Sequence, residues 1–378
     1  MIAPDCMITR IWGRAGAGMA GFGGIIRGMT ARVVVVGAGI VGLTCAVRLA
    51  EAGLQVDVLA RELPRETMSA ISPGLWLPPH PPDGAGGAVA DAVTLWARET
   101  LAELRRLAAD GDATGVRILP GTLLHRRPRP GTGPLAGSGP LAGSGPLAGY
   151  GPLAGYGPLA GYGVDAVRVA DPAPGYPAGD RADLPAVDVP RHLDHLAARL
   201  AAADGTLTRL PLPALPTRGL VVDCAGVAAR ALARDDGVRP VRGQCVLLAD
   251  PGLPDWWCDD DPADPTVVVP HGRVVAVGGT RDDGVWDTTP DDVTARRLVE
   301  RAARLEPRLR DAAVLRHRAG LRPARRCVRV DAERLPTPDD PGHVRVHCYG
   351  HGDDGVALAW GSAGAVLDTV RSVIAGAA

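Results

Sequence analysis

The residue types best suited to chemistry gather toward the C-terminal end of this 378-residue chain. Arg322 stands in the segment GLRPARRCVR (320–329), and Asp353 and Asp354 stand in CYGHGDDGVALAWG (348–361). A guanidinium can bind a carboxylate through two parallel, charge-assisted hydrogen bonds. The closely spaced glycines of the second segment allow its backbone to come very near a bound group. These features predict a site for a small molecule that carries a carboxylate.

The two aspartates leave three interpretations open. One of them could pair with a cationic part of the substrate, such as a basic side chain or a second amine. Both could turn outward and pair with surface arginines. The site could also have changed to a different amine substrate or lost activity. Asp353 and Asp354 need a partner in any active site of this kind, because unpaired carboxylates would repel a substrate carboxylate.

A glycine-rich turn near residue 40 must position a second group. The apolar run Val33–Val36 predicts a strand, and Gly37, Gly39 and Gly42 follow it in GxGxxG spacing. Apolar residues at helical spacing come next, ending at Gly53, and LQVDVLA predicts another strand. Strand, glycine turn, helix and strand form the context in which such a turn binds the pyrophosphate of a dinucleotide.

The residues after the second strand indicate less clearly how a ribose would be bound. The strand ends in VLARE, so that Ala60 stands where an acidic residue usually holds the ribose. Arg61 and Glu62 follow, and Glu62 is the candidate for the ribose. A solvated Arg61–Glu62 charge pair is the alternative.

Four further segments carry a resemblance to a known family. They are SAISPGLWLPP (69–79), VVDCAGV (221–227) followed by PVRGQ (240–244), GLRPARRCVR and CYGHGDDG. In this order, behind the GxGxxG turn, they resemble the D-amino-acid oxidase family, whose wider group of amine-oxidising flavoproteins includes glycine and sarcosine oxidases. The resemblance runs from about Val33 to Leu367.

The resemblance implies an α/β fold with a Rossmann-like FAD-binding domain and a substrate domain on a mixed sheet. FAD is then the cofactor, in place of NAD. The implied cofactor-binding residues are those of the turn, the loop along the flavin, the VVDCAGV segment and the segment facing the isoalloxazine: Gly37, Gly39, Ile40, Gly42, Arg61, Glu62, Thr67, Ser69, Gly74, Leu75, Gly226, Gly352, Gly355, Val356 and Ala357.

The resemblance also implies the reaction. Arg322 would bind the substrate carboxylate and place the carbon next to nitrogen over flavin N5, to which it loses a hydride. The imine would hydrolyse to an oxo product, and O2 would reoxidise the flavin and give hydrogen peroxide. Arg325 and Arg329 are expected to be structural. An FAD dehydrogenase with another electron acceptor, a non-catalytic flavin-binding homologue and an NAD-binding protein are the alternatives.

One departure from the family concerns a tyrosine that helps to hold the substrate carboxylate. Val267 stands at its place. Loss of that contact to a charged group would cost about 1.5–3 kcal/mol for the same substrate. His271 could compensate, although a solvated turn histidine is the simpler interpretation. Together with the aspartate pair, Val267 suggests a specialised basic or secondary-amine substrate.

The remaining segments define the expected organisation. Residues 134–163 hold five tandem PLAG[SY]G copies, which we interpret as a flexible surface insertion. Helices are predicted over 189–205, over 289–307 with Thr289 as N-cap and Pro290 in the first turn, and over 361–378. The predicted parts are a disordered or misassigned extension (1–30), an FAD-binding domain (31–78, 185–240 and 318–378) and a substrate domain (79–184 and 241–317).

Composition restricts the partners. The net charge is −1, which gives no indication of nucleic-acid binding, and no apolar run is long enough to span a bilayer. Seven cysteines without a CxxC pair favour a reduced, cytoplasmic protein with no zinc site. His192 and His195 lack a third metal ligand at suitable spacing, and the acidic run 259–265 lacks the calcium-loop pattern, so no metal site is predicted. A homodimer is left open.

Overall fold

The computed structural model describes residues 31–79, 87–126, 159–259, 261 and 265–377. A parallel group of strands forms one end of its sheet, in the order β14-β7-β1-β2-β6. Val and Leu dominate these strands, as expected for strands that are covered on both faces. Their bounds are β1 (Arg32–Val36), β2 (Gln55–Ala60), β6 (Thr206–Arg209), β7 (Leu220–Asp223) and β14 (Val344–His351).

A long strand, β13 (Val314–Arg334), joins this group to the rest of the sheet. Its second half pairs with β14 and its first half pairs with β8, both antiparallel. The remaining strands continue in the order β8-β11-β10-β9-β3-β5-β4, with β12 beside β8. They are β3 (Val116–His125), β4 (Ala166–Ala173), β5 (Tyr176–Val187), β8 (Arg239–Ala249), β9 (Trp256–Asp259), β10 (Val267–Pro270), β11 (Val274–Gly278) and β12 (Asp282–Asp283).

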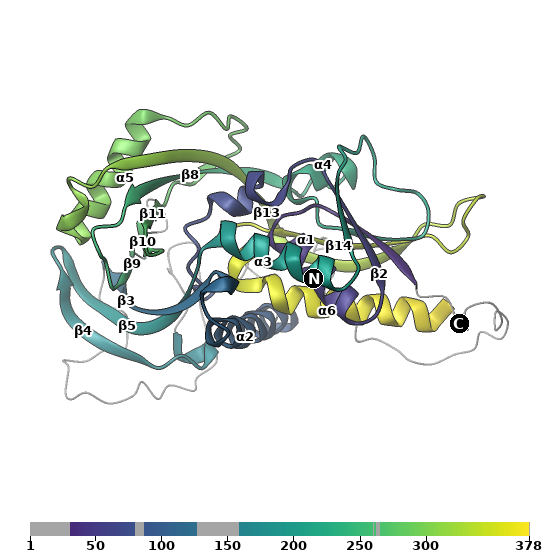
Figure 1. The fold of residues 1–378 in the computed structure, drawn as a ribbon, viewed down its shortest axis with the longest axis horizontal. Helices are drawn as coiled ribbons and strands as arrows, with labels where there is room; N and C mark the ends of the chain where they lie inside the picture. The colour runs from purple at the N-terminus through teal and green to yellow at the C-terminus, as the bar shows by residue number, and fades with distance from the viewer. Residues whose placement is uncertain (1–30, 80–86, 127–158, 260, 262–264, 378) are drawn as a thin grey trace.

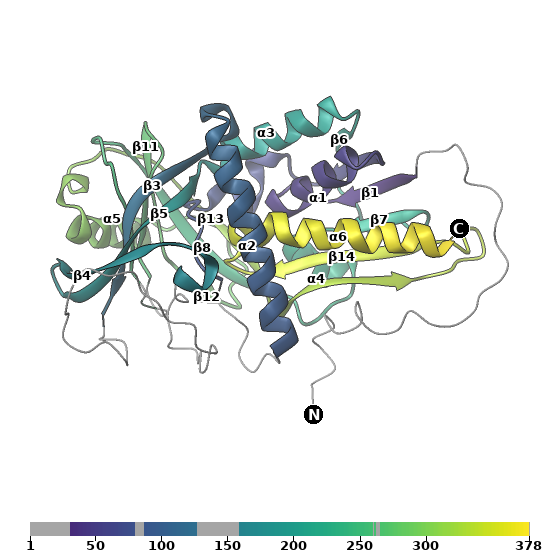
Figure 2. The same cartoon turned by 90° about the horizontal axis from the view of Figure 1, so that it is seen from below.

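Helices cover both parts of the sheet. In Figure 2, α6 runs beside β14, and α2 crosses α6. In the same view α1 and α3 lie next to one another. α5 packs on β8 and β11 at the far end (Figure 1). The helices are α1 (Ile40–Glu51), α2 (Gly87–Ala109), α3 (Val189–Ala202), α4 (Ala229–Leu232), α5 (Asp292–Leu305) and α6 (Gly355–Ala377). Short 3-10 helices are η2 (Pro64–Glu66), η3 (Met68–Ile71), η4 (Asp112–Thr114), η5 (Leu159–Tyr162), η6 (Gly226–Ala228) and η7 (Pro307–Leu309).

Alternating residues of β1 contact opposite layers of the core. Val33 and Val35 belong to the large cluster that includes the buried faces of α1 and α6. Val36 packs with Leu215 and Val221 on the other face. Since side chains of a strand alternate between faces, this arrangement requires an apolar residue at every position, which explains the run of valines.

These observations confirm the α/β fold with a large mixed sheet and most predicted elements. Two helix boundaries were predicted wrongly. The side chain of Asp291, and not that of Thr289, caps α5, accepting a hydrogen bond from the Thr294 N–H at 2.6 Å. α6 begins at Gly355, six residues before the predicted start, so its first turn includes the segment predicted to face the flavin.

The last copy of the repeat was also misinterpreted as surface chain. Leu159 and Tyr162 are buried, and the Tyr162 ring meets Trp76 edge-on, with ring centroids 5.9 Å apart. The other four copies and the extension 1–30 lie outside the described residues. The division into two domains stays a prediction, because one continuous sheet runs through both parts.

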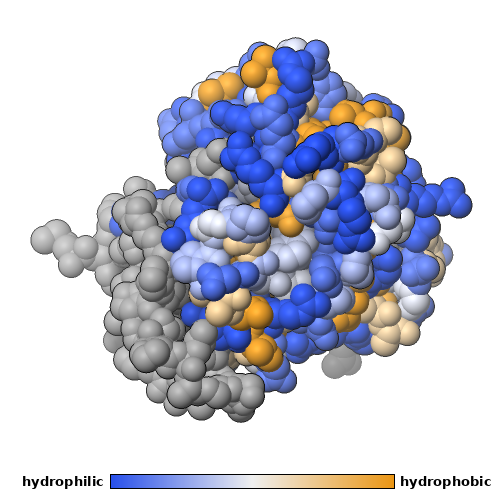
Figure 3. Space-filling model, turned by 90° about the vertical axis from the view of Figure 1, so that its left-hand side faces the viewer, coloured by the Kyte–Doolittle hydropathy of each residue, from blue (hydrophilic) through white to orange (hydrophobic). Residues whose placement is uncertain are grey.

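One end of the molecule has a mixed surface. Figure 3 shows the β-strand and α5 end of the molecule, where hydrophobic side chains form separate groups among hydrophilic ones. Among the described helices, none combines the length and the hydropathy required to cross a bilayer. The homodimer and the compartment stay predictions.

The close crossing of α6 and α2 can be tested at Gly361. A Cβ there would lie 2.2 Å from the Cα of Trp96, whereas one at Gly364 would meet only Glu99 Oε2 at 3.7 Å. We expect Gly361→Ala to lower the free energy of unfolding by about 1–3 kcal/mol. The matched variant Gly364→Ala should be neutral or more stable by up to about 1 kcal/mol. Urea unfolding followed by circular dichroism measures both, and equal stability of the two variants would contradict the crossing.

Candidate active site

One cavity of about 530 Å3 collects the predicted site residues. It lies where four parallel strands end, since the residues directly after β1, β2, β7 and β14 all line it. Ligands of open α/β sheets bind in this position, at the carboxyl ends of the strands. Every candidate catalytic or cofactor-binding residue named from the sequence lines the same cavity.

The glycine turn is shaped by contacts that leave no room for side chains. Gly37 has φ +113°, and a Cβ on it would lie 2.4 Å from the Cys224 carbonyl oxygen. A Cβ on Gly42 would lie 2.1 Å from the Gly37 carbonyl oxygen. Gly39 is the N-cap of α1 and provides no side-chain cap. The positive end of α1 therefore opens directly into the cavity, as binding of a phosphate requires.

The next loop is held against both the turn and the antiparallel strands. The Ile40 N–H donates to Ser69 Oγ at 3.0 Å, and the Thr67 hydroxyl donates to the Pro64 carbonyl at 2.7 Å. Gly74 has φ +77° and exchanges close backbone contacts with Val187, whose N–H donates to the Gly74 carbonyl at 2.6 Å. Hydrogen bonds therefore tie this loop to the glycine turn at Ser69 and to β5 at Gly74.

Arg61 and Glu62 pair with each other at the cavity wall. Arg61 Nη2 lies 2.7 Å from Glu62 Oε1, and 65% and 42% of their side chains are exposed. This geometry matches the alternative prediction, a solvated charge pair between Arg61 and Glu62. The ribose role of Glu62 stays a prediction.

The guanidinium of Arg322 lies in the cavity with two defined partners. Its Nη1 donates to the Thr280 carbonyl at 2.7 Å, and its Nε lies 2.5 Å from Asp353 Oδ1. Asp353 Oδ2 lies 3.1 Å from Nη1 of Arg281, which also lines the cavity. Asp353 therefore bridges two arginines, one from β13 and one from the segment after β11.

This bridge decides between the interpretations for Asp353. It pairs with arginines, as in the second interpretation. Both arginines line the cavity, and 40% of the Arg281 side chain is exposed, against 15% for Arg322. Asp354 lies at the start of α6, where its N–H donates to the His351 carbonyl and its carbonyl accepts from the Leu358 N–H. A helix N-terminus is a favourable place for a carboxylate.

Gly243 makes room for the arginine from the neighbouring strand. A Cβ there would lie 2.2 Å from Arg322 Nη1, so any side chain would displace the guanidinium. Gly243 belongs to the PVRGQ segment, and its role as space for Arg322 was not foreseen. Arg281 was missed as well, although its place two residues after the Gly278–Gly279 pair that ends β11 is a signal that could have found it.

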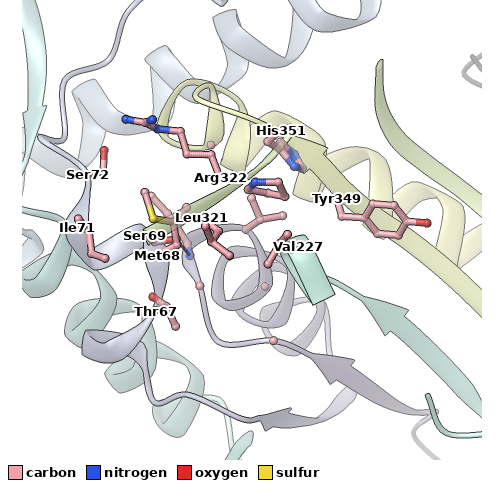
Figure 4. Close-up of a pocket in the computed structure, with 18 of the residues that line it drawn as sticks. Thr67, Met68, Ser69, Ile71, Ser72, Val227, Leu321, Arg322, Tyr349 and His351 are labelled. Carbon is pink, nitrogen blue, oxygen red and sulfur yellow. Dashed lines mark hydrogen bonds between the residues drawn. The ribbon is translucent and has the colours of Figure 1, made fainter. Parts of the chain in front are cut away.

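Among the described residues, neither Tyr349 nor Tyr176 takes the place of the family tyrosine at which this chain has Val267. Figure 4 shows the Tyr349 ring pointing away from Arg322 and the other labelled side chains, and its hydroxyl donates to Asp235 at 2.9 Å. Burial and the neighbouring Asp235 raise the pKa of Tyr349. Tyr176 donates instead to Asp259 at 2.8 Å. Val267 itself lines the cavity as an apolar wall.

His271 does not compensate for Val267 and is not a solvated turn residue. Its Nε2 lies 2.8 Å from the Pro73 carbonyl oxygen, and it is absent from the cavity lining. Burial lowers its pKa. The expected structural roles of Arg325 and Arg329 are confirmed, because both pair with Asp235.

The histidine pair on α3 has a structural position. His192 Nδ1 donates to the Thr114 carbonyl at 2.9 Å, and burial lowers its pKa to about 4. Five cysteines are buried free thiols: Cys45, Cys224, Cys245, Cys258 and Cys348. Cys327 is also buried.

Comparisons with known proteins agree with this geometry. The family described as FAD dependent oxidoreductase (DAO) matches residues 32–138 and 190–369. The chain belongs to this family. It is 39% identical over 342 residues to a D-amino-acid oxidase of Rubrobacter xylanophilus, covering 89% of this chain and 94% of that protein. Human D-aspartate oxidase is 30% identical over 352 residues, covering 91% and 95%.

Solved structures match the fold of this DAO-family chain. Glycine oxidase from Bacillus cereus has a TM-score of 0.67 at 16% identity, covering 91% of this chain and 95% of that chain. The protein is therefore an FAD-dependent oxidoreductase of the D-amino-acid oxidase type, and FAD is its cofactor. The cavity fits this cofactor, since it reaches from the N-terminus of α1 at the glycine turn, where Gly39 provides no side chain, to the first turn of α6.

The fit of the glycine turn to FAD can be tested at Gly42. We expect Gly42→Ala to purify with little or no bound flavin, because its Cβ would collide with the Gly37 carbonyl and deform the turn. Gly87→Ala at the start of α2 is the matched control, since a Cβ there meets nothing within 4 Å. Absorbance of bound flavin measures the difference, and circular dichroism checks that both variants fold. Full flavin content in Gly42→Ala would contradict the assigned turn.

Proposed function

We propose that this protein is an amino-acid oxidase in which Arg322 binds the substrate carboxylate beside the flavin. The observation that carries this proposal is the guanidinium of Arg322, which lies in the cavity with Nε held by Asp353 and Nη1 held by Thr280. The D-amino-acid oxidases among the relatives support the same reaction class.

In this proposal Asp353 is a positioning residue. Its bond to Nε leaves the terminal nitrogens to face a carboxylate, which is the geometry of a bidentate pair. The Thr280 carbonyl limits rotation of the guanidinium, and Gly243 leaves the space that it occupies. The substrate would therefore meet an arginine whose direction is set before binding, which lowers the entropy cost of alignment.

The charges of the site favour a substrate with one carboxylate. In the Arg281–Asp353–Arg322 bridge the two arginines contribute two positive charges and Asp353 neutralises one of them. Asp354 also lines the cavity, but it stands at the N-terminus of α6, where the helix dipole offsets its charge. One substrate carboxylate completes the balance, whereas a second carboxylate would have to compete with Asp353 for Arg281. Asp353 already pairs with Arg281 and Arg322, so in this proposal it does not bind a cationic side chain of the substrate. The main argument for a basic substrate therefore no longer applies. The apolar Val267 wall suits a neutral side chain.

The cofactor would be held by the residues that the cavity gathers around the turn, the loop and the start of α6. FAD, when bound, supplies the acceptor for the hydride and afterwards passes the electrons to O2. The protein binds the carboxylate, orients the carbon next to nitrogen and shields it from water with Val267 and Leu321. Since no described side chain is required as a base, the substrate amine is expected to react in its neutral form.

The substrate class is tested by anaerobic reduction of the bound flavin. We expect a D-amino acid with a neutral side chain to bleach the flavin faster than D-aspartate, D-lysine or N-methylglycine, because the Arg281–Asp353–Arg322 bridge leaves one positive charge for one substrate carboxylate. The L-enantiomers serve as controls. Fastest reduction by the basic substrate or by N-methylglycine would contradict the charge balance and restore the basic or secondary-amine alternative.

The role of Arg322 is tested by Arg322→Ala. Loss of a buried partner of the carboxylate should cost about 2–5 kcal/mol, roughly a 30- to 5,000-fold decrease in kcat/KM, with flavin still bound. Arg318→Ala is the matched control on the same strand, because Arg318 contacts the Arg65 carbonyl outside the cavity. Equal activity of the two variants would contradict the proposal.

The electron acceptor is tested with the same protein. Oxygen uptake with release of one hydrogen peroxide per substrate is expected for the oxidase. Rapid reduction of the flavin without oxygen uptake would instead identify a dehydrogenase with another acceptor.

A further inference from the structure

Three cysteines from separate segments meet directly beneath the glycine turn. Cys45 lies in α1, Cys224 follows β7 and Cys348 lies in β14, and all three are buried. Their sulfur atoms lie within 4.8 Å of one another, and those of Cys45 and Cys348 are 4.0 Å apart. Within the described residues, no other group of three His, Cys, Asp or Glu side chains meets this distance.

The spacing suits coordination of one metal ion. A zinc–thiolate bond is about 2.3 Å long, so three sulfurs around one such ion in a plane are about 4.0 Å apart. The separation of Cys45 and Cys348 already has this value. A small movement of Cys224 would complete the triangle.

The donor set selects the kind of ion. Thiolates are soft ligands that favour Cu+, Zn2+ and similar ions with filled d shells, whereas Mg2+ and Ca2+ require oxygen ligands. No carboxylate belongs to the group. Burial also disfavours ions that keep a water shell.

We propose that Cys45, Cys224 and Cys348 form a binding site for one soft metal ion. The ion would join α1, β7 and β14, the three elements that support the dinucleotide turn. Cys224 contacts that turn closely, because its carbonyl oxygen and its Cβ limit the space at Gly37 and Gly42. A metal ion that binds only the folded chain raises its stability. The proposal does not depend on which substrate the enzyme oxidises.

The experiment uses Cd2+ as the probe, added to the reduced, flavin-loaded protein after treatment with a chelator. We expect one Cd2+ per chain by elemental analysis, an ultraviolet thiolate-to-metal absorption band and a higher Tm. The single variants Cys45→Ala, Cys224→Ala and Cys348→Ala should lose all three signals. Cys258→Ala, which removes a buried thiol on β9, is the matched control and should keep them.

The proposal is overturned if the wild type binds no Cd2+, or if the three variants bind as much as Cys258→Ala. X-ray absorption at the cadmium edge of the wild-type protein provides a test that needs no variant. Three sulfur neighbours are expected, and a shell of oxygen and nitrogen alone would also overturn the proposal.

Discussion

The double pairing of β13 is the constraint on which the site depends. One half of this strand is hydrogen-bonded to β14 of the parallel group and the other half to β8 of the antiparallel group. Arg322 lies near the junction, opposite Val241 of β8, and only two residues from Ala324, which pairs with both neighbours. A residue at this junction therefore lies close both to the carboxyl ends of the parallel strands and to the antiparallel strands next to β8. The strand pairing thus brings the guanidinium of Arg322, which we propose binds the substrate carboxylate, to the edge of the sheet where the glycine turn lies.

Close backbone contacts then shape the cavity from the opposite side. Gly37 and Gly42 admit no side chain, because carbonyl groups occupy the space in which a Cβ would lie. Gly74 is restricted in the same way by Val187. These contacts leave helix N-termini and backbone N–H groups as the surface that a dinucleotide meets, which explains why glycine spacing carries so much of the family signature.

Charge pairing completes the site, and here reasoning from sequence was least successful. Asp353 was recognised as unusual, but its partners could not be chosen, because Arg281 lies more than 70 positions earlier in the chain and on another element. Arg322 was identified through its motif, whereas its contact with Gly243 depends on the register between β8 and β13. The start of α6 was placed too late, because glycine and aspartate at its beginning resemble a loop. Tyr162 looked like part of a flexible repeat, yet it packs against Trp76.

The sequence by itself determined the parallel strand–turn–helix unit and the family, and it named residues that line one cavity. These depend on local patterns, such as valine runs and glycine spacing, whose physical causes act over a few residues. Only the tertiary structure decided how distant charges and thiols combine. The Arg281–Asp353–Arg322 bridge and the cluster of Cys45, Cys224 and Cys348 each require three separate segments to meet. Such meetings depend on strand order and register, which no short stretch of sequence specifies.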